Sequence, residues 1–223
     1  STLSPMYRAG VGTGAGDAWS LSLWAKGGVS TNKQQTLFCF GSSSVVEGKI
    51  WLWWDNSNGN NKLVLQYGSK HEYLKMETPS SSFLGGNWKH VLVTYDGGTT
   101  GDTPGSEATY FSRFNIFIDG TLQTLVGSHG SNGFVDQIPA TLLSVGKSTE
   151  GGNSLRGAHI DDVAIWGSDQ TASASDIYNS GATQDLTLLP SAPVNFWKMG
   201  DGDSYPILKD KVGTEDLKMG NMT

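Results

Sequence analysis

The feature that most constrains the fold is a two-residue alternation of apolar and polar side chains, which recurs in short segments along the chain. Residues 18–24 and 88–95 both alternate in this way. Successive side chains of a β-strand point to opposite faces, so this period predicts strands with one buried face. Further strands are predicted at 35–40, 49–54, 62–67, 114–118, 121–126, 142–145, 160–166 and 194–199.

Turn residues separate these segments. The polar run at 55–61 and the dipeptide Asp119-Gly120 predict hairpin turns. Glycine accounts for 30 of the 223 residues and charged residues for only 16%, which fits tight turns better than a helical bundle. Only residues 171–178 look helical. We therefore predict an all-β fold, a two-sheet antiparallel sandwich of roughly a dozen strands with one short helix.

Length and charge narrow the domain organisation and the classes of partner. No linker is long enough to divide the chain, so residues 1–223 are expected to form a single domain. The 15 basic and 21 acidic residues give a net charge of −6, which disfavours nucleic-acid binding. The sequence contains no run of about 18 apolar residues, so it predicts no membrane-spanning helix. The one cysteine, Cys39, lies in an apolar run and is expected to be a buried core residue.

Five stretches, in order along the chain, resemble strands of laminin G-like, concanavalin A-like jelly rolls. They are SLSLWAK at 20–26, NWKHVLVTYDG at 87–97, NIFIDG at 115–120, SVGKS at 144–148 and GAHIDDVAIW at 157–166. The helical segment 171–178 also falls where that family has a half-turn of helix. The resemblance spans residues 18–180 and implies the concanavalin A-like jelly-roll sandwich.

The C-terminal part of the chain narrows the resemblance. VNFWKMGDGD at 194–203 resembles the strand that usually opens such a domain, and KDKVG at 209–213 resembles the turn after it. Here the strand follows the body, as in laminin G-like modules of structural proteins of tailed phages. Either segment 194–199 supplies a strand of the same sandwich, or it starts a second module. The first is simpler, because an orphan amphipathic strand would expose a sheet edge.

The sequence lacks the catalytic patterns of this scaffold. The glucanases of this fold carry Glu-x-Asp-x-x-Glu on one strand, and none of the six glutamates here is followed two residues later by aspartate. There is also no G-x-S-x-G elbow and no H-E-x-x-H zinc pair. His90, within a strand, is expected to be structural. We therefore expect a protein that is not an enzyme.

Calcium is the one cofactor that the resemblance suggests, in a structural role. Asp161 occupies the position of an aspartate that helps to hold calcium in related glucanases, and Asp162 follows it. Asp201 and Asp203, with Asp210, form a second acidic cluster. Ca²⁺ prefers such hard oxygen ligands. The alternative is that these carboxylates only hydrogen-bond neighbouring turns.

Aromatic side chains could stack on sugar rings. Four tryptophans are expected to be core residues because they lie in the packing strands of the family: Trp24, Trp88, Trp166 and Trp197. Trp51 and Trp53 share one face of their strand and Trp54 points to the other, so at least one is expected to face a ligand or a partner. The alternatives are a central strand or a subunit interface. The predicted glycan or partner surface comprises Trp54, Tyr67, His71 and Tyr73.

Two functions are consistent with these features. The first is a non-enzymatic virion module of a phage, in a tail, a fibre or a capsid decoration, which binds other virion proteins or host-surface glycans. Such proteins often oligomerise, so a homo-oligomer is expected with it. The second is a secreted or cell-surface bacterial lectin-like module that binds polysaccharide. An endoglycanase is third, because the carboxylate spacing is missing.

Overall fold

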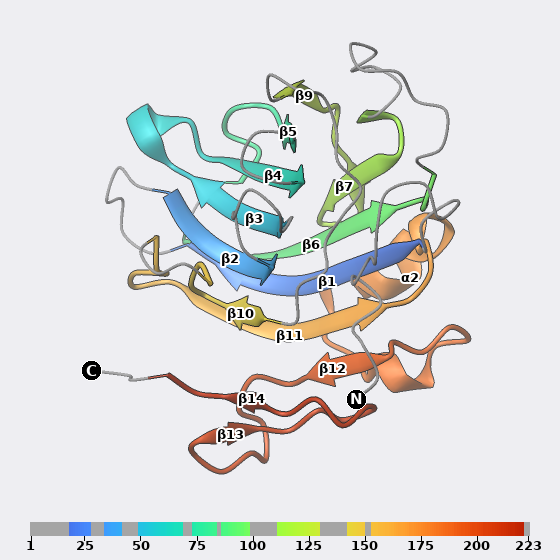
Figure 1. Ribbon diagram of the computed structural model, residues 1–223. Coiled ribbons are helices and arrows are strands. Elements are labelled where there is room, and N and C mark those ends of the chain that lie inside the picture. The colour runs from blue at the N-terminus through green and yellow to red at the C-terminus, as the bar shows by residue number, and fades with distance from the viewer. Residues whose placement is uncertain are drawn as a thin grey trace.

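The computed structural model describes residues 18–27, 34–41, 49–68, 73–83, 86–98, 111–129, 142–149 and 153–220. Within these ranges, two six-stranded antiparallel sheets pack face to face, and the short helix α2 lies beside them (Figure 1). This confirms the predicted all-β, two-sheet sandwich. No helix in these ranges is long and apolar enough to cross a membrane.

The first sheet, called here the β1 sheet, has the order β12-β11-β1-β6-β7-β8. Its strands are β12 (Asn195–Trp197), β11 (His159–Trp166), β1 (Trp19–Lys26), β6 (Trp88–Tyr95), β7 (Phe114–Ile118) and β8 (Thr121–Leu122). The C-terminal strand β12 pairs antiparallel with β11 at the edge of this sheet. The segment that resembles a first strand is therefore hydrogen-bonded to the body of the sandwich.

The second sheet, called the β3 sheet, has the order β10-β2-β3-β4-β5-β9. Its strands are β10 (Leu143–Val145), β2 (Gln34–Gly41), β3 (Lys49–Asp55), β4 (Lys62–Gly68), β5 (Tyr73–Glu77) and β9 (Val126–His129), and the turn η1 (Ser57–Gly59) joins β3 to β4. The strand expected over 121–126 is divided between the sheets, because β8 ends at Leu122 and β9 starts at Val126. The intervening residues carry the chain from one sheet to the other.

The core between the sheets follows from the alternation. In β1, Leu21 and Leu23 are fully buried in the central cluster, while Ser20 and Ser22 point to the outer face of the sheet. An aromatic group fills the middle, where the rings of Tyr95 and Phe114 stack with centroids 4.6 Å apart. Burial of side chains of this size supplies most of the favourable free energy of such a fold.

The outer face of the β1 sheet is covered by a second layer, called here the cover segment, residues 171–189. It contains η2 (Thr171–Ser173), α2 (Ala174–Tyr178), η3 (Asn179–Gly181) and η4 (Leu186–Leu188). Ile177 and Leu186 pack with Trp166 in a second apolar cluster on this face. The cover segment explains why strands of the β1 sheet have apolar side chains on both faces.

A small C-terminal hairpin lies beside β12 (Figure 1). It consists of β13 (Ile207–Leu208) and β14 (Leu217–Lys218). The carboxylate of Asp210, between these strands, accepts hydrogen bonds from the Asn195 side chain at 2.6 Å and the Phe196 backbone at 3.0 Å. The Asp210 side chain therefore links the hairpin to β12 through hydrogen bonds.

Candidate functional site

Two residues of the predicted aromatic surface lie in the core. Trp54 is 2% exposed and packs against Phe83, and Tyr67 is fully buried against Tyr95. The prediction that Trp54 and Tyr67 face a glycan or a partner is therefore wrong. Both point into the space between the sheets, because β3 and β4 use that face for the core. Tyr73 is half-buried in β5, and His71 lies outside the described residues.

Trp51 and Trp53 occupy the outer face of β3, which pairs on both sides and is a central strand. Their rings pack together with centroids 4.3 Å apart, and the Lys49 ammonium lies 4.2 Å from the Trp51 centroid. The Trp51 Nε1 donates to Thr36 Oγ1. A sugar needs a free ring face on which to stack. These rings are occupied by their own packing partners and form no such platform.

An exposed aromatic surface lies instead at one end of the β1 sheet. Trp88, Lys26 and His159 form one cross-strand row, because Lys26 pairs with Trp88 on β6 and with His159 on β11. We call this row the Trp88 shelf. Trp88 is 43% exposed, so the expectation that it is a core residue is wrong. The Trp88 and His159 rings approach with centroids 6.1 Å apart.

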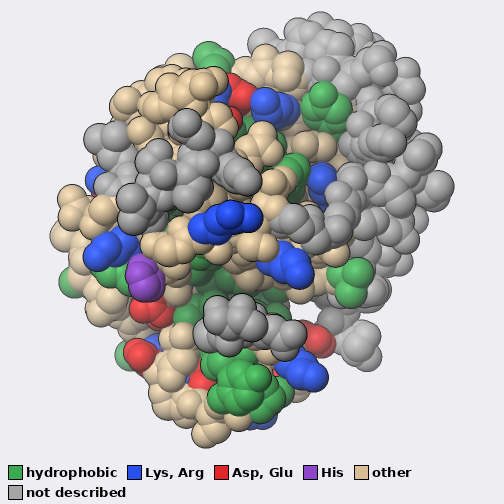
Figure 2. Space-filling model, turned by 90° about the vertical axis from the view of Figure 1, so that its left-hand side faces the viewer, with side chains coloured by type: hydrophobic (Ala, Val, Ile, Leu, Met, Phe, Trp, Pro, Cys, Tyr) green, Lys and Arg blue, Asp and Glu red, His purple; other side chains and the backbone are tan. Residues whose placement is uncertain are grey.

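The position of the shelf explains its exposure. Trp88 is the first residue of β6 and follows the exposed turn residues Gly86 and Asn87. The cover segment packs farther along the strands, over Leu92 and Ala164. In Figure 1, β11 begins at the left, and Figure 2 views the molecule from that side, where histidine, basic and acidic side chains lie close together at the surface.

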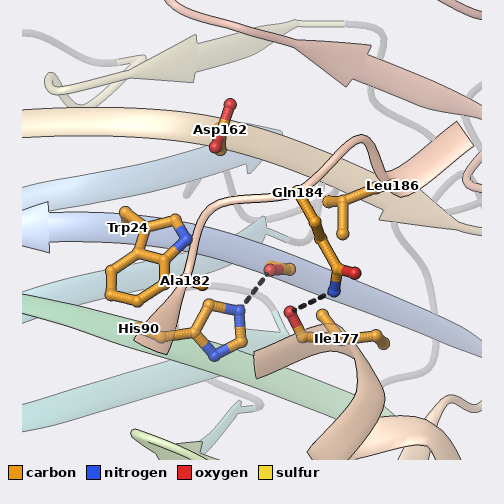
Figure 3. Close-up of a pocket in the computed structure, with 8 residues that line it drawn as sticks. Trp24, His90, Asp162, Ile177, Ala182, Gln184 and Leu186 are labelled. Carbon is orange, nitrogen blue, oxygen red and sulfur yellow. Dashed lines mark hydrogen bonds between the residues drawn. The ribbon is translucent and has the colours of Figure 1, made fainter. Parts of the chain in front are cut away.

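The next row of side chains supports the shelf from below. Trp24 pairs with His90 across β1 and β6, and their rings meet edge to face with centroids 5.2 Å apart. Tyr178, from α2, contacts both of these rings, at 6.2 Å and 5.7 Å. His90 also hydrogen-bonds Ser22 Oγ through Nε2 at 2.8 Å (Figure 3). The shelf is therefore built on a packed aromatic layer rather than on a loop.

His90 is a structural member of this layer. It is 1% exposed, and burial lowers its pKa to about 4 even though the nearby Asp119 carboxylate acts in the opposite direction. The imidazole is thus neutral at pH 7, where it can share a hydrogen bond with Ser22 but carries no charge. The expectation of a structural histidine at this position agrees with its burial.

A small pocket opens between this layer and the cover segment. Figure 3 shows Trp24 and His90 on one side of it, Gln184 and Ile177 on another, and Asp162 on β11. It has room for about one water molecule, so no sugar ring fits inside.

Asp162 has a backbone φ of 47°, at the point where the register of β1 and β11 shifts. Burial, and then the neighbouring Asp161, raise the pKa of Asp162 to about 6.

The four predicted calcium ligands do not form a metal site by themselves. Asp161 uses Oδ1 to accept a hydrogen bond from the Asp162 backbone, and Asp203 pairs with Lys211 at 2.8 Å. Asp201 lies close enough to raise the pKa of Asp161, after the larger effect of burial. In the ranges that the structure describes, no three His, Cys, Asp or Glu side chains are arranged to hold a metal ion. A structural calcium stays a prediction.

Sequence reasoning missed the shelf and its supporting layer. Trp88 and Trp24 were predicted to be core residues because they lie in strands that match the packing strands of the family. A local feature did point the other way, since Trp88 directly follows a glycine-containing turn and so stands at a strand end. Tyr178 could not be placed without the tertiary structure, because its contacts lie 88 and 154 residues away at His90 and Trp24.

Comparison with known proteins identifies the family. The model of the concanavalin A-like lectin/glucanases superfamily, of the Laminin_G_3 type, matches residues 8–177. The chain belongs to this family. The match includes the Trp88 shelf and most of the layer beneath it, whereas the hairpin of β13 and β14 lies beyond the matched residues. No curated protein sequence matches the chain.

Solved structures similar to this concanavalin A-like chain are distant in sequence. The CBM40 module of the Ruminococcus gnavus IT-sialidase superposes with a TM-score of 0.50 at 11% identity, covering 74% of this chain and 83% of that module. A leech intramolecular trans-sialidase superposes with a TM-score of 0.49 at 12% identity, covering 80% of this chain and 27% of that enzyme. A botulinum neurotoxin type C structure superposes with a TM-score of 0.47 at 14% identity, covering 76% of this chain and 37% of that one.

Proposed function

We propose that this chain is a non-catalytic carbohydrate-binding module and that it holds glycans on the Trp88 shelf. The exposed Trp88 ring carries the proposal. It is a large flat apolar surface at the end of a sheet, in a chain of the lectin and glucanase superfamily. An indole ring of this kind stacks on the apolar face of a sugar, while polar neighbours bind the hydroxyl groups.

The surroundings of Trp88 suit this role. His159 and Lys26 supply polar atoms in the same row, and the exposed Asn87 is next to Trp88 in the chain. The aromatic layer of Trp24, His90 and Tyr178 restrains the strands from below, so little conformational entropy is lost on binding. Asn87, Trp88 and His159 are all exposed, as expected for a module that grips part of a longer polysaccharide.

The absence of the Glu-x-Asp-x-x-Glu pattern supports a non-catalytic role. Glycoside hydrolysis needs a carboxylic acid with a raised pKa beside a second carboxylate. Burial alone would raise the pKa of Glu77, but hydrogen bonds and charge from Lys62 and Lys75 outweigh it and hold that pKa below its ordinary value. Glu77 is therefore an ion-pair residue of the β3 sheet rather than a proton donor.

Glycan-array binding tests the proposal with three proteins: the parent chain, Trp88→Ala and Tyr205→Ala. Tyr205 is a matched control, because it is 72% exposed and lies in the C-terminal turn rather than on the shelf. We expect Trp88→Ala to weaken binding by about 10-fold or more, as loss of a stacking aromatic does, and Tyr205→Ala to leave it unchanged. Equal binding by all three proteins would refute the shelf as the glycan site.

The array should include sialylated glycans, because the similar Ruminococcus gnavus module belongs to a sialidase. The parent must also be tested for hydrolysis of each glycan that it binds. Release of sugar would contradict the non-catalytic assignment. A chain that binds no glycan on the array would contradict the proposed function itself.

We propose the phage particle as the setting in which the module acts. This rests on the resemblance of 194–203 and 209–213 to structural proteins of tailed phages. Mass spectrometry of purified particles would detect the chain in a tail, fibre or capsid decoration, and light scattering of the recombinant chain would show whether it forms a homo-oligomer. Detection only in culture supernatant or on a bacterial surface would favour the secreted or cell-surface module instead.

A further inference from the structure

We infer that the Trp88 shelf selects acidic sugars, with the Lys26 ammonium group pairing with the carboxylate or sulfate of the ligand. This inference rests on the proposed function, since it names the ligand class of the same site. It is carried by the juxtaposition of an exposed aromatic ring and a lysine that forms no ion pair or hydrogen bond among the described residues. Both side chains lie on the outer face of the β1 sheet, in adjacent strands.

Lys26 lies in the strand between those that carry the two rings of the shelf. Its strand, β1, lies between β6 and β11, and Lys26 pairs with Trp88 on one side and with His159 on the other. A ligand ring stacked on Trp88 would therefore place its substituents over Lys26. The lysine is half-buried, and a lysine in such a position packs its aliphatic stem against its neighbours while its ammonium group stays in solvent, where a bound ligand can reach it.

The charge of Lys26 is not neutralised within the described part of the chain, where it forms no ion pair or hydrogen bond. Other lysines of the sandwich differ in this respect. Lys89, in the next row, pairs with Asp119, and Lys75 pairs with Glu77 at 2.7 Å. The chain has a net charge of −6, so basic groups are outnumbered by acidic ones that could pair with them. A lysine without an ion-pair partner in the described ranges, in the same row as an exposed indole, suits a sugar ring that carries a negative charge.

A neutral sugar would not use this arrangement fully. Hydroxyl groups can accept from an ammonium group, but the charged hydrogen bond to a carboxylate or sulfate is roughly twice as strong. The indole supplies the apolar contact that both kinds of sugar share. Trp88 is therefore expected to set the overall affinity, and Lys26 to set the preference for an acidic over a neutral ligand.

Titration calorimetry with three related sugars tests this division. The probes are lactose, 3′-sialyllactose and 3′-sulfolactose, which share a core and differ in the acidic group. We expect the parent to prefer both acidic sugars, and Lys26→Gln to weaken only these, by about 5-fold, the upper range for an exposed ion pair. Raising the ionic strength should reduce the preference in the parent and leave lactose binding unchanged.

Two further variants separate charge from fold. Lys26→Arg keeps the positive charge and should keep the acidic preference. Lys218→Gln removes an exposed lysine of β14, far along the chain from the shelf, and should behave as the parent does. The melting temperature of each variant shows whether the fold is retained. A preference for only one acidic sugar would identify the acidic group as carboxylate or as sulfate.

The outcomes distinguish this inference from the proposed function. If the parent binds lactose as tightly as the acidic sugars, and Trp88→Ala abolishes binding, the shelf is a glycan site but acidic selection is refuted. If Lys26→Gln keeps the parental preference, Lys26 is not the selecting residue and the inference also fails. If no sugar binds to the parent at all, the proposed function fails and the inference fails with it.

Discussion

Replacing Asp210 by alanine should detach the C-terminal hairpin from β12. The Asp210 carboxylate accepts four hydrogen bonds, from the Asn195 side chain at 2.6 Å and from the backbone of Phe196, Val212 and Glu215 at 3.0, 3.1 and 3.3 Å. Two of these donors belong to β12 and two to the hairpin loop. No other residue type offers two charged oxygens in one short side chain at this junction.

The expected loss of stability follows from these contacts. A hydrogen bond to a charged group contributes about 1.5–3 kcal/mol, but bonds that share one carboxylate are not additive, and water can replace some of them here. We therefore expect Asp210→Ala to cost about 3 kcal/mol. For a chain of this length that corresponds to a fall in Tm of roughly 6–12 °C.

The pH dependence gives a second measure of the same effect. Burial would raise the pKa of Asp210, but the hydrogen bonds from the Asn195 side chain and from the backbone of Phe196 and Val212 outweigh it, so the pKa lies below its ordinary value of 3.8. A carboxyl group with a lowered pKa stabilises the fold above the unfolded-state pKa, and the stabilisation disappears as pH falls through the folded-state value. The difference in Tm between parent and variant should therefore be full at pH 7 and shrink below about pH 4.

Thermal unfolding, together with hydrogen exchange over residues 207–218, is the assay. Glu215→Ala is the matched control, because Glu215 is an exposed acidic residue of the same hairpin loop, its side chain makes no hydrogen bond in the described ranges, and its backbone contacts remain in the variant. The control should stay within about 0.5 kcal/mol of the parent. If Asp210→Ala melts with the control and its hairpin amides exchange no faster, the reasoning is refuted.

Three other predictions concern buried charge and calcium. Because burial lowers the His90 pKa to about 4, stability should decline as pH falls from 6.5 to 4, by on the order of 3 kcal/mol, and His90→Gln should flatten that profile in pH-dependent denaturation. The raised pKa of Asp162 means that its ionisation costs stability as pH rises above 3.8. Asp162→Asn should therefore raise stability at pH 7 by about 1 kcal/mol after allowance for solvent screening, and give no gain at pH 3. If calcium is bound, EDTA should lower the Tm of the purified chain; an unchanged Tm with no metal in elemental analysis would remove the calcium prediction.

The sequence by itself predicted the architecture, because the alternation that defines a strand is a local property. The two-residue period in 18–24 and 88–95 becomes β1 and β6, and the helical pattern at 171–178 becomes η2 and α2. Order along the chain, matched motif by motif, was enough to suggest the family. These features need no knowledge of what each strand packs against.

The faces of the strands were not predictable in the same way. Trp51 and Trp53 on one face of β3, and Trp54 on the other, present apolar rings to both sides, so the pattern does not show which side is the core. The tertiary structure resolves this, because the β1 sheet packs over the face of Trp54. Trp51 and Trp53 then lie on the outer face, where they pack against side chains of the β3 sheet itself, with Lys49 against Trp51.

The candidate site depended on the tertiary structure almost entirely. Trp88 and His159 are 71 residues apart, and they meet only because β1 lies between their strands and brings Lys26 into the same row. Whether Trp88 is exposed depends on where the cover segment ends, which is set by the packing of α2 on the far part of the sheet. Local residue type determined that there would be strands, whereas contacts distant in sequence decided which of their aromatic side chains can meet a ligand.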